Sequence, residues 1–548
     1  MTQIARRKYY RKLRRDFDQW SWVTLLVTLF VGVPLLFIFF KLFGGAGESW
    51  GHMVKYLLPK YLTNTLLLSL ICMVLTITMG VSAAWLSTRY HFPLRKSLEW
   101  LNILPLALPS YITAYAYAGI FDYGGSLQLL LQGLSLSIPK IDIMNVNGLA
   151  FVLSVSLYPY VYVACRAFFL YQSQNLIETA QVLGDSRAQR FFRLILPMAR
   201  PAIVGGFILV LMEVLNDFGA AKYYGVNTFT TGIFKAWYGY REPETAVYLA
   251  ALLLVIIFAL ILLEQWQRKR KRYHFAGKSQ KKLARLEVPR GRSWGYTLIV
   301  AIPAILGFLI PVAQLIYWAV LSFHNTQWAD LFTAIFQSVA IGAIAAAACV
   351  FFAILLLFTS QWNALSGVRT VSRFGALGYA IPGAVIAVGV YMPSLVVDKW
   401  IIGVVKDLFS VKIGLLLTGT ATALVYAYVV RFLAVAFNPL AAGQQKMSAS
   451  LSEASYLLGW GRLRTFWKLE FPLLRSAILS AFILVFIDVM KELPLTLILK
   501  PNHIQTLAVE AYQYASDERI IEAAWPALVL VLSGTIPVIF LNRLVRNE

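Results

Sequence analysis

Apolar runs of about twenty residues recur along this 548-residue chain, and they restrict its fold more than any other feature. Inside a bilayer, only helices and closed barrels satisfy every backbone hydrogen bond. Barrel strands alternate polar and apolar residues over about ten positions, whereas these runs are apolar throughout. With 59% hydrophobic and only 14% charged residues, the chain is predicted to be an all-α polytopic membrane protein.

The runs predict about twelve transmembrane helices, six in each half of the chain. The first run is too long for the core of a signal peptide and no small-residue cleavage pattern follows it, so we expect an uncleaved span. The expected spans cover residues 20–40, 63–86, 99–120, 148–170, 201–221, 245–263, 295–320, 335–358, 374–396, 412–437, 474–492 and 524–541.

Basic residues, which give a net charge of +23, gather between Arg6 and Arg15 and between Arg268 and Arg292. Such clustering is typical of the cytoplasmic loops of membrane proteins, so nucleic acid is not an expected partner. The loops at 88–96 and 368–373 are also basic. If the N-terminus is cytoplasmic, the number of spans that precedes each of these segments and the C-terminus places them all on the cytoplasmic side as well. The predicted organisation is a basic N-terminus (1–20), a first repeat (21–265), a basic linker (266–293) and a second repeat (294–548).

A polar, basic loop occurs twice with a constant offset. Glu178-Thr-Ala-Gln-Val-Leu-Gly184, followed by Pro197, matches Glu453-Ala-Ser-Tyr-Leu-Leu-Gly459, followed by Pro472, at an offset of 275 residues. Glycine permits a sharp turn between two short helices, and proline resets the chain before the next span. Because each copy has an even number of spans, the copies are expected to lie parallel around an axis along the membrane normal, with a pore on that axis.

Other segments extend this duplication. Asn64-Thr65 corresponds to Gln337-Ser338, and Leu108-Pro109 corresponds to Ile381-Pro382 at an offset of 273. Tyr160-Val-Tyr162 before Arg166 resembles Tyr426-Ala-Tyr428 before Arg431. We therefore expect the two halves to share one helix order.

Carboxylates occur inside the span that follows each loop. Glu213 and Asp217 in the first copy match Asp488 and Glu492 in the second, again at an offset of 275. Residues four apart share one helical face, so the four carboxylates are expected to converge near the outer end of the pore. Ionised groups in a span need water or a partner. Two interpretations remain open and are compatible, namely local pairing with Lys491 and Lys222, and a mouth that attracts cations.

The repeated loop resembles the cytoplasmic loop of permease subunits in binding-protein-dependent ABC importers. This resemblance implies a type I ABC importer-like fold, in which the loop docks on an ATPase subunit and transmits its motion into the membrane. The residues to which it assigns this coupling role are Glu178, Ala180, Gly184, Arg187, Pro197, Glu453, Ala454, Gly459, Arg462 and Pro472.

The segments from Asn216 to Phe234 and from Lys491 to Leu497 resemble the fused two-copy permeases of ferric iron importers. Fe(III) is a hard cation that favours carboxylate and phenolate oxygens. Because Lys-Glu-Leu-Pro in the second copy replaces Asn-Asp-Phe-Gly, no stable metal site is predicted. The expected pathway residues are Glu213, Asp217, Asp488, Glu492, Tyr223 and Tyr224.

The chain contains no Gly-x-x-x-x-Gly-Lys-Ser/Thr phosphate loop, so it is predicted to be a translocating subunit rather than an enzyme, with no cofactor of its own. The resemblance implies two ATPase subunits carrying ATP and Mg²⁺ at the cytoplasmic face, one periplasmic or extracellular binding protein at the outer face, and a bacterial cytoplasmic (inner) membrane. The alternatives are a fused thiamine permease and a secondary transporter with two six-helix halves. The loop at 87–97 lacks the Gly and Asp expected of the latter.

Overall fold

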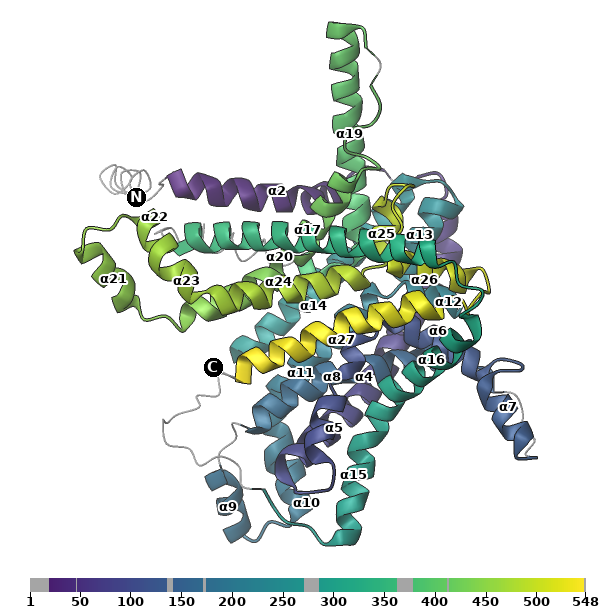
Figure 1. The fold of residues 1–548 in the computed structure, drawn as a ribbon, viewed down its shortest axis with the longest axis vertical. Coiled ribbons are helices and arrows are strands. Elements are labelled where there is room, and N and C mark those ends of the chain that lie inside the picture. Colours follow the sequence, from purple (N-terminus) through teal and green to yellow (C-terminus); the bar gives the residue numbers. More distant parts are fainter. Residues whose placement is uncertain are drawn as a thin grey trace.

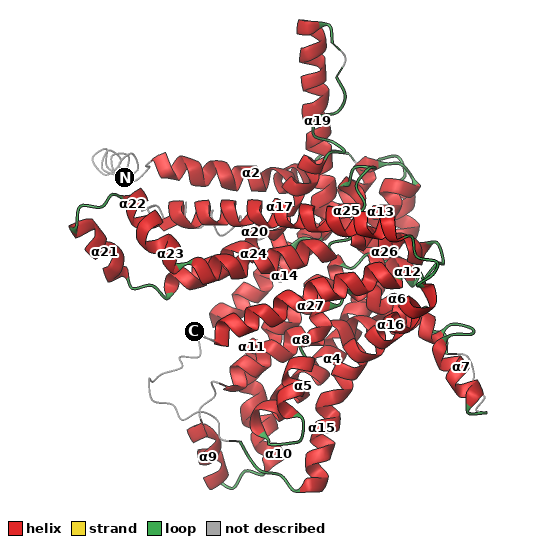
Figure 2. Cartoon of the chain, viewed as in Figure 1, coloured by secondary structure: helices red, strands yellow, loops and turns green. Residues whose placement is uncertain are grey.

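The computed structural model describes residues 19–546 except 46, 136–140, 171–173, 271–284, 362–377 and 412. The basic N-terminus, the centre of the linker and the loop at 368–373 therefore lie outside the described residues. Regular structure within the described ranges is helical, apart from an isolated bridge between Tyr90 and Leu286 (Figure 2). The predicted all-α class is confirmed.

The first half of the chain forms a series of long helices joined by short ones. Its elements are α2 (Gln19–Lys41), α3 (Trp50–His52), η1 (Met53–Leu57), α4 (Leu58–Arg89), α5 (Arg95–Leu101), η2 (Leu104–Ala107), α6 (Ser110–Phe121), α7 (Ser126–Gly133), α8 (Val146–Leu170), α9 (Gln174–Val182), α10 (Arg187–Gln189), η3 (Arg190–Ile195), α11 (Leu196–Asn216), α12 (Gly219–Tyr223), α13 (Phe229–Phe234), η4 (Lys235–Gly239) and α14 (Pro243–Arg270).

The second half repeats this order. Its elements are α15 (Arg290–Ala304), η5 (Ile305–Leu309), α16 (Ile310–Ser322), α17 (Trp328–Gln361), η6 (Gly378–Ala380), α19 (Gly383–Phe409), α20 (Ala421–Gln445), α21 (Ala449–Leu457), α22 (Arg462–Thr465), η7 (Phe466–Glu470), α23 (Phe471–Leu473), α24 (Arg475–Lys491), α25 (Pro494–Leu499), α26 (Leu507–Ser516) and α27 (Ala524–Arg546).

Among the described residues, nine helices are long and apolar enough to cross a membrane, and two bent pairs raise the number to eleven. The twelfth predicted span corresponds to α27, whose apolar part, Ala524–Pro537, is shorter. The bent pairs are Arg95–Ala107 with Ser110–Gly133, at 97°, and Arg462–Leu473 with Arg475–Lys491, at 70°. Two boundaries differ clearly from expectation, because α19 ends at Phe409 rather than near residue 396 and α20 begins at Ala421 rather than near residue 412. The apolar residues before Ala421 run back along α19 instead.

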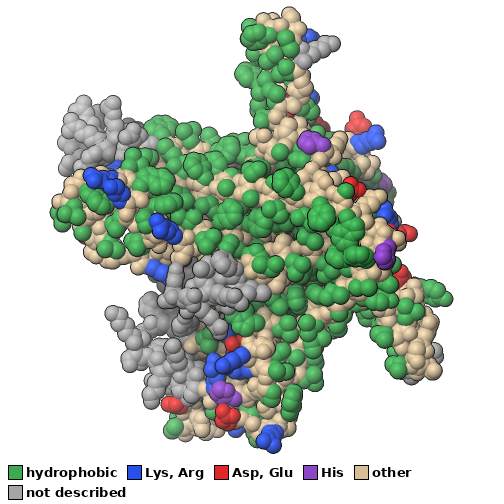
Figure 3. Space-filling view, in the orientation of Figure 1, with side chains coloured by type: hydrophobic (Ala, Val, Ile, Leu, Met, Phe, Trp, Pro, Cys, Tyr) green, Lys and Arg blue, Asp and Glu red, His purple; other side chains and the backbone are tan. Residues whose placement is uncertain are grey.

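The two repeats are parallel. Both α11 and α24 start beside the repeated loops and end beside α12 and α25, and Figure 1 shows α9 and α21 toward the end of the bundle where the marked termini lie. We call this end the loop face, defined by α9, α10, α21 and α22, and the opposite end, with α12 and α25, the mouth face. In Figure 3, hydrophobic side chains cover most of the visible surface between these ends, and charged side chains gather toward the ends.

The helices pack into two buried clusters, and each cluster contains helices from both sequence repeats. One buried cluster joins α2 and α14 of the first repeat to α17, α19 and α20 of the second. Thr24 Oγ1 lies 2.7 Å from Thr359 Oγ1, and Tyr426 Oη donates to the Phe30 carbonyl at 2.6 Å. The other cluster joins α15 and α16 to α4, α6 and α8, where Tyr117 Oη donates to the Leu306 carbonyl at 2.7 Å. Each repeat therefore packs helices against the other half, α2 and α14 from the first repeat and α15 and α16 from the second.

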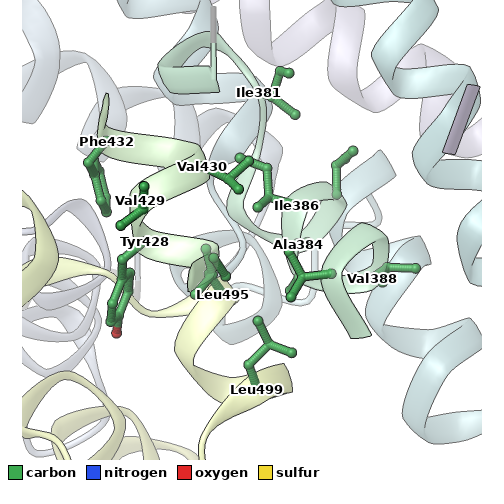
Figure 4. Packing of buried hydrophobic residues seen from close by; sticks show 14 of the residues in the cluster. Ile381, Ala384, Ile386, Val388, Tyr428, Val429, Val430, Phe432, Leu495 and Leu499 are labelled. Carbon is green, nitrogen blue, oxygen red and sulfur yellow. The ribbon is translucent and has the colours of Figure 1, made fainter. Parts of the chain in front are cut away.

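The start of α19 is packed on every side. Ala384, Ile386 and Val388 interleave with residues of α20 and with Leu495 and Leu499 of α25 (Figure 4). All three side chains are fully buried. This apolar contact holds the N-terminus of α19 against the site described next.

Candidate functional site

A polar chamber of about 110 Å³ lies where the two repeats meet. It is lined by the mouth-face ends of α11 and α24, by η2 and the start of α6, by η6, and by α8 and α20. The sequence places four carboxylates on α11 and α24, and all four line this chamber. They are Glu213, Asp217, Asp488 and Glu492.

The second-repeat side of the chamber contains a buried ion pair. Arg431 Nη1 lies 3.0 Å from Glu492 Oε1, and both side chains are almost fully buried. The same oxygen accepts the Leu495 backbone N–H at 3.1 Å. A Cβ atom on Gly383 would collide with both members of the pair, so glycine at the start of α19 leaves the room that the pair occupies.

The first-repeat side holds its carboxylate without a cation. Ser110 Oγ donates to Asp217 Oδ2 at 2.7 Å, and the Ala221 N–H donates to Asp217 Oδ1 at 3.0 Å. Asp217 makes no ion pair with any residue that the structure describes, and Lys222 is exposed. The expected Asp217–Lys222 pairing is therefore not formed, because hydroxyl and backbone donors hold Asp217 instead.

The ends of α11 and α24 make reciprocal contacts with the opposite repeat. Asn216 Oδ1 accepts the N–H of Gly383, the first residue of α19, at 2.9 Å. Lys491, at the equivalent position of α24, donates to the Leu106 carbonyl of η2 at 3.3 Å. Lys491 also pairs with Asp488 at 3.3 Å, which confirms that expected contact. The end of α11 is thus bonded to the start of α19 in the second repeat, and the end of α24 is bonded to η2 in the first.

A larger and mainly apolar cavity of about 780 Å³ adjoins the chamber. Its other lining residues include Asn438 and Ala442 near the end of α20 that leads to the repeated loop, so it extends toward the loop face. Five residues line both cavities, namely Leu106, Tyr160, Tyr379, Asp488 and Lys491. These residues lie at the boundary between the two cavities.

On the mouth-face side of the chamber, the repeats are in close contact. A Cβ atom on Gly219 would lie 2.7 Å from Tyr111 Cβ and 2.8 Å from Leu493 Cδ2. Since Cβ atoms essentially never approach other atoms so closely, glycine at this position allows α12 to pack directly on α6 and on the residue before α25.

The predicted Tyr223 and Tyr224 lie outside the chamber. Tyr224 is buried and donates to the Ala114 carbonyl at 3.2 Å. Tyr223 lines a separate cavity of about 120 Å³ that also includes Asp122 and Asp142. The structure therefore brings together the four predicted carboxylates, but not these two phenols.

Tyr379 and Arg431 are chamber residues that were not identified from the sequence. Arg431 was missed because the Tyr-x-Tyr motifs of the two repeats were aligned out of register. Helices α8 and α20 are related by 275 residues at both ends, so Arg431 stands where the first repeat has Ser156, and both line the chamber. The apparent match between the two Tyr-x-Tyr motifs is out of register, and Arg166 pairs with Glu99 at 3.0 Å instead. A strict 275-residue alignment would have placed Arg431 beside the carboxylates. Tyr379 has no such signal, because its counterpart is Leu106.

Both repeated loops contain the left-handed glycine that the sequence predicts. The backbone φ angle is +87° at Gly184 and +77° at Gly459, a region that strains other residues. Pro197 and Pro472 occupy the first turn of α11 and α23, where the missing N–H is not needed. Glu178, Arg187, Glu453, Ala454 and Arg462 are exposed, whereas Ala180 is buried and its 275-residue counterpart is Ser455.

Each loop also exposes two adjacent apolar side chains just before its glycine. Val182 and Leu183 are 87% and 79% exposed, and the equivalent Leu457 and Leu458 are 89% and 75% exposed. Pairs of large apolar residues at equivalent exposed positions mark a contact surface.

The inner faces of the two loops differ in chemistry. In the first repeat, Ile177 of α9 and Ile195 of η3 are buried in the same apolar cluster. The equivalent residues of the second repeat are Ser452 and Glu470, and Ser452 Oγ donates to Glu470 Oε1 at 3.0 Å. An apolar contact in one copy is thus replaced by a hydrogen bond to a buried carboxyl group in the other.

The sequence matches the binding-protein-dependent transport system inner membrane component family twice, over residues 76–272 and 364–547. The chain belongs to this family. It is 27% identical to the Fe(3+)-transport system permease protein FbpB 2 of Haemophilus influenzae, over 95% of this chain and 98% of that protein. It is 23% identical to the ferric transport system permease protein FbpB of Actinobacillus pleuropneumoniae, over 85% of this chain and 69% of that protein.

A more distant likeness covers only part of the chain. The sulfate transport system permease protein CysT of Salmonella typhimurium is 28% identical over 30% of this chain and 57% of its own length. The two relatives that match most of this chain are thus named as ferric transport permeases, and the permease fold and internal duplication predicted from the sequence are confirmed.

Proposed function

We propose that this protein is the membrane-spanning permease of an ATP-driven importer and that its cargo is ferric iron delivered by a binding protein. The observation that carries the choice of cargo is the chamber between the repeats, where four carboxylates face two basic side chains. An excess of carboxylates attracts a hard cation, whereas it would repel an anion such as sulfate. The two relatives named as ferric transport permeases, which match 95% and 85% of this chain, support the same choice.

The loop face is the proposed cytoplasmic side, and the mouth face is the proposed outer side. On this assignment both termini and the basic linker are cytoplasmic, as expected from the positive-inside rule. One ATPase subunit would bind α9 and α10, and a second would bind α21 and α22. The exposed Val182–Leu183 and Leu457–Leu458 pairs would provide the apolar contact, and Glu178 and Glu453 the polar one.

The ionised groups of the chamber provide a short polar path rather than a tight site. Within the described residues, no group of three or more His, Cys, Asp or Glu side chains has the geometry to hold a metal ion. Fe(III) would have to displace Lys491 from Asp488 and pass Tyr160 and Tyr379, which line both cavities, to reach the apolar cavity on the loop side. Weak, sequential contacts suit transport because the ion must leave as readily as it enters.

Uptake by the complete complex in proteoliposomes tests the proposal. We expect ATP-dependent accumulation of radiolabelled iron, and no accumulation of thiamine or sulfate. Glu213→Gln should lower iron uptake while the ATPase activity of the complex persists. Uptake driven by an ion gradient without ATP, or uptake of thiamine instead of iron, would overturn the corresponding part of the proposal.

Two loop variants test the coupling role separately from the cargo. Gly184→Pro and Glu453→Lys should abolish transport and substrate-stimulated ATP hydrolysis while the protein still inserts into the membrane. Glu287→Lys is a matched control, because Glu287 is a highly exposed glutamate in the linker on the same face. Normal uptake by both loop variants would refute the docking role.

A further inference from the structure

Helix α19 and the segment that follows it form an unusual extension of the bundle. Figure 1 shows α19 leaving the bundle across the direction of α2 and α17. After Val390, only Ser394 and Asp398 of α19 are buried. We call residues 391–420 the spur.

The first repeat makes the same turn. The segment Ser110–Gly133 is bent by 97° from the preceding segment Arg95–Ala107. Pro109 and Pro382, 273 residues apart, precede α6 and α19 with nearly identical backbone angles, φ −57° and ψ 139° for Pro109 and φ −55° and ψ 141° for Pro382. The lateral direction of α19 is therefore a property of both copies, although its length and composition alone would allow it to cross a bilayer.

The spur is a built unit rather than a single projecting helix. The fully buried Asp398 carboxylate accepts the backbone N–H groups of Leu416, Leu417 and Thr418 at 3.1, 2.9 and 2.7 Å. These bonds hold the returning segment against one face of α19. Three hydrogen bonds to one carboxylate are strong because the acceptor is charged.

The opposite face of α19 carries an apolar stripe with nothing from the described chain upon it. Val396, Trp400, Val404 and Leu408 follow a spacing of four residues and are 63%, 68%, 36% and 71% exposed. Lys399 and Lys406 lie seven residues apart on another side of the helix and are exposed. An apolar stripe with tryptophan and flanking lysines is typical of helices that lie in a membrane interface.

The depth of the spur fits that location. A Cβ atom on Gly389 would lie 2.5 Å from Ile38 Cδ1 and 2.9 Å from the Pro34 carbonyl, so α19 crosses α2 at these residues. They lie three to seven residues before Lys41, the end of α2. At about 1.5 Å per residue, the crossing is roughly 5–10 Å below the end of the spanning helix. Interfacial helices bury their apolar face to about the same depth.

We propose that the spur lies in the plane of the lipid bilayer at its mouth-face surface, with Val396, Trp400, Val404 and Leu408 against the acyl chains and Lys399 and Lys406 among the phosphate groups of the lipids. Because the Gly383 N–H at the start of α19 binds Asn216 in the chamber wall, the spur connects that wall directly to the membrane surface. The proposal depends on the placement of the bundle in a membrane and not on the cargo.

Spin-label depth measurements test this placement. The four single variants Val396→Cys, Trp400→Cys, Val404→Cys and Leu408→Cys are labelled in the full-length protein in vesicles of phosphatidylethanolamine and phosphatidylglycerol. The native cysteines, Cys72, Cys165 and Cys349, are buried, and the unmutated protein measures any label that they take up. Collision rates with oxygen and with a water-soluble nickel chelate then report the depth of each label.

We expect one common shallow depth for all four labels. A helix that crosses the bilayer would instead give depths that differ by about 18 Å between residues 396 and 408. Labels at Leu26, Val33 and Phe40, exposed positions along α2, provide the control, since in a spanning helix the central label at Val33 should lie deeper than the labels toward the two ends. A steady progression along the spur would overturn the proposal.

The same measurements distinguish a spur in lipid from a spur that projects into water and binds a soluble protein. If the spur served to bind a soluble protein, all four stripe labels would collide freely with the nickel chelate in vesicles, and adding the binding protein would protect them. That result would overturn the lipid assignment. Lys399→Cys and Lys406→Cys should be accessible to the chelate in either case, so they show that labelled protein of native fold is being measured.

Discussion

The Arg431–Glu492 pair in the chamber allows a quantitative test of how α20 is held to the end of α24 within the second repeat. Both side chains are almost fully buried, and the charged atoms are 3.0 Å apart. Removing one member of such a pair leaves an uncompensated buried charge, which typically costs about 3–5 kcal/mol. In Arg431→Met, Glu492 keeps the Leu495 N–H, so we expect a loss near the lower end, about 3 kcal/mol.

Replacing both members should cost much less than the sum of the single changes. Apolar side chains of similar volume can substitute for a buried ion pair at little or no cost. For the double variant Arg431→Met/Glu492→Met we therefore expect a loss of about 1 kcal/mol or less. Since each single change should cost about 3 kcal/mol or more, the double-mutant cycle should give a coupling energy of about 5 kcal/mol or more.

The free energy of unfolding is measured by titration with a denaturing detergent in mixed micelles, monitored by far-UV circular dichroism. Arg519→Met is the matched control, because Arg519 pairs with Glu522 at 3.3 Å in a solvent-exposed position. An exposed pair should contribute less than about 1 kcal/mol. Additive single effects at Arg431 and Glu492, or a loss at Arg431 as small as that of the control, would refute the reasoning.

Two further predictions concern single carboxyl groups. Glu470→Ile removes the acceptor of the Ser452 hydrogen bond. It should raise the rate of hydrogen exchange of the α21 amides roughly 5–30-fold, as expected for the loss of about 1–2 kcal/mol. The double variant Ser452→Ile/Glu470→Ile recreates the apolar contact of the first repeat and should restore slow exchange. Burial and the nearby Asp330 raise the pKa of Glu510, on α26 at the mouth face, to about 7. The neutral form of Glu510 is therefore favoured in the folded protein, so the stability of the fold should fall as pH rises from the unfolded-state pKa toward 7. Glu510→Gln should therefore raise the melting temperature relative to the unmutated protein at pH 8 but not at pH 5.

Each of these predictions has a result that would contradict it. Slow exchange in Glu470→Ile alone would mean that the Ser452 bond does not hold α21. An equal change of melting temperature for Glu510→Gln at both pH values would mean that Glu510 does not titrate in this range.

Much of the fold and part of the site follow from simple sequence rules. The 275-residue offset places Glu213, Asp217, Asp488 and Glu492 together, and the structure brings all four into one chamber. Gly184 and Gly459 adopt positive φ angles for the reason that their position between two short helices indicates. The shared helix order is confirmed in detail, since Asn64 donates to the Asn227 carbonyl at 3.0 Å, and its counterpart Gln337 accepts the Gln505 N–H at 2.7 Å.

Other features depend on information that hydropathy does not contain. An apolar run gives the length of a helix but not its direction, so the sequence does not indicate that α19 leaves the bundle across the direction of α2 and α17. Tyr379 enters the chamber because η6 turns beside α20, and no residue pattern in its first-repeat counterpart signals this. Tyr223 and Tyr224 were predicted from their chemistry, but the short helix α12 turns them toward α6 and the outer surface.

The exchange of helices between the halves has a consequence for biogenesis. Thr359, the partner of Thr24, is 335 residues further along the chain, so at typical synthesis rates α2 enters the bilayer roughly 15–70 s before its docking partner is made. During that interval α2 must be stable in lipid by itself. Its sequence allows this, because Thr24 also donates to the Trp20 carbonyl and Thr28 donates to the Thr24 carbonyl of the same helix. Helix α2 is thus inserted well before it can pack against α17, and lipid surrounds it during that interval.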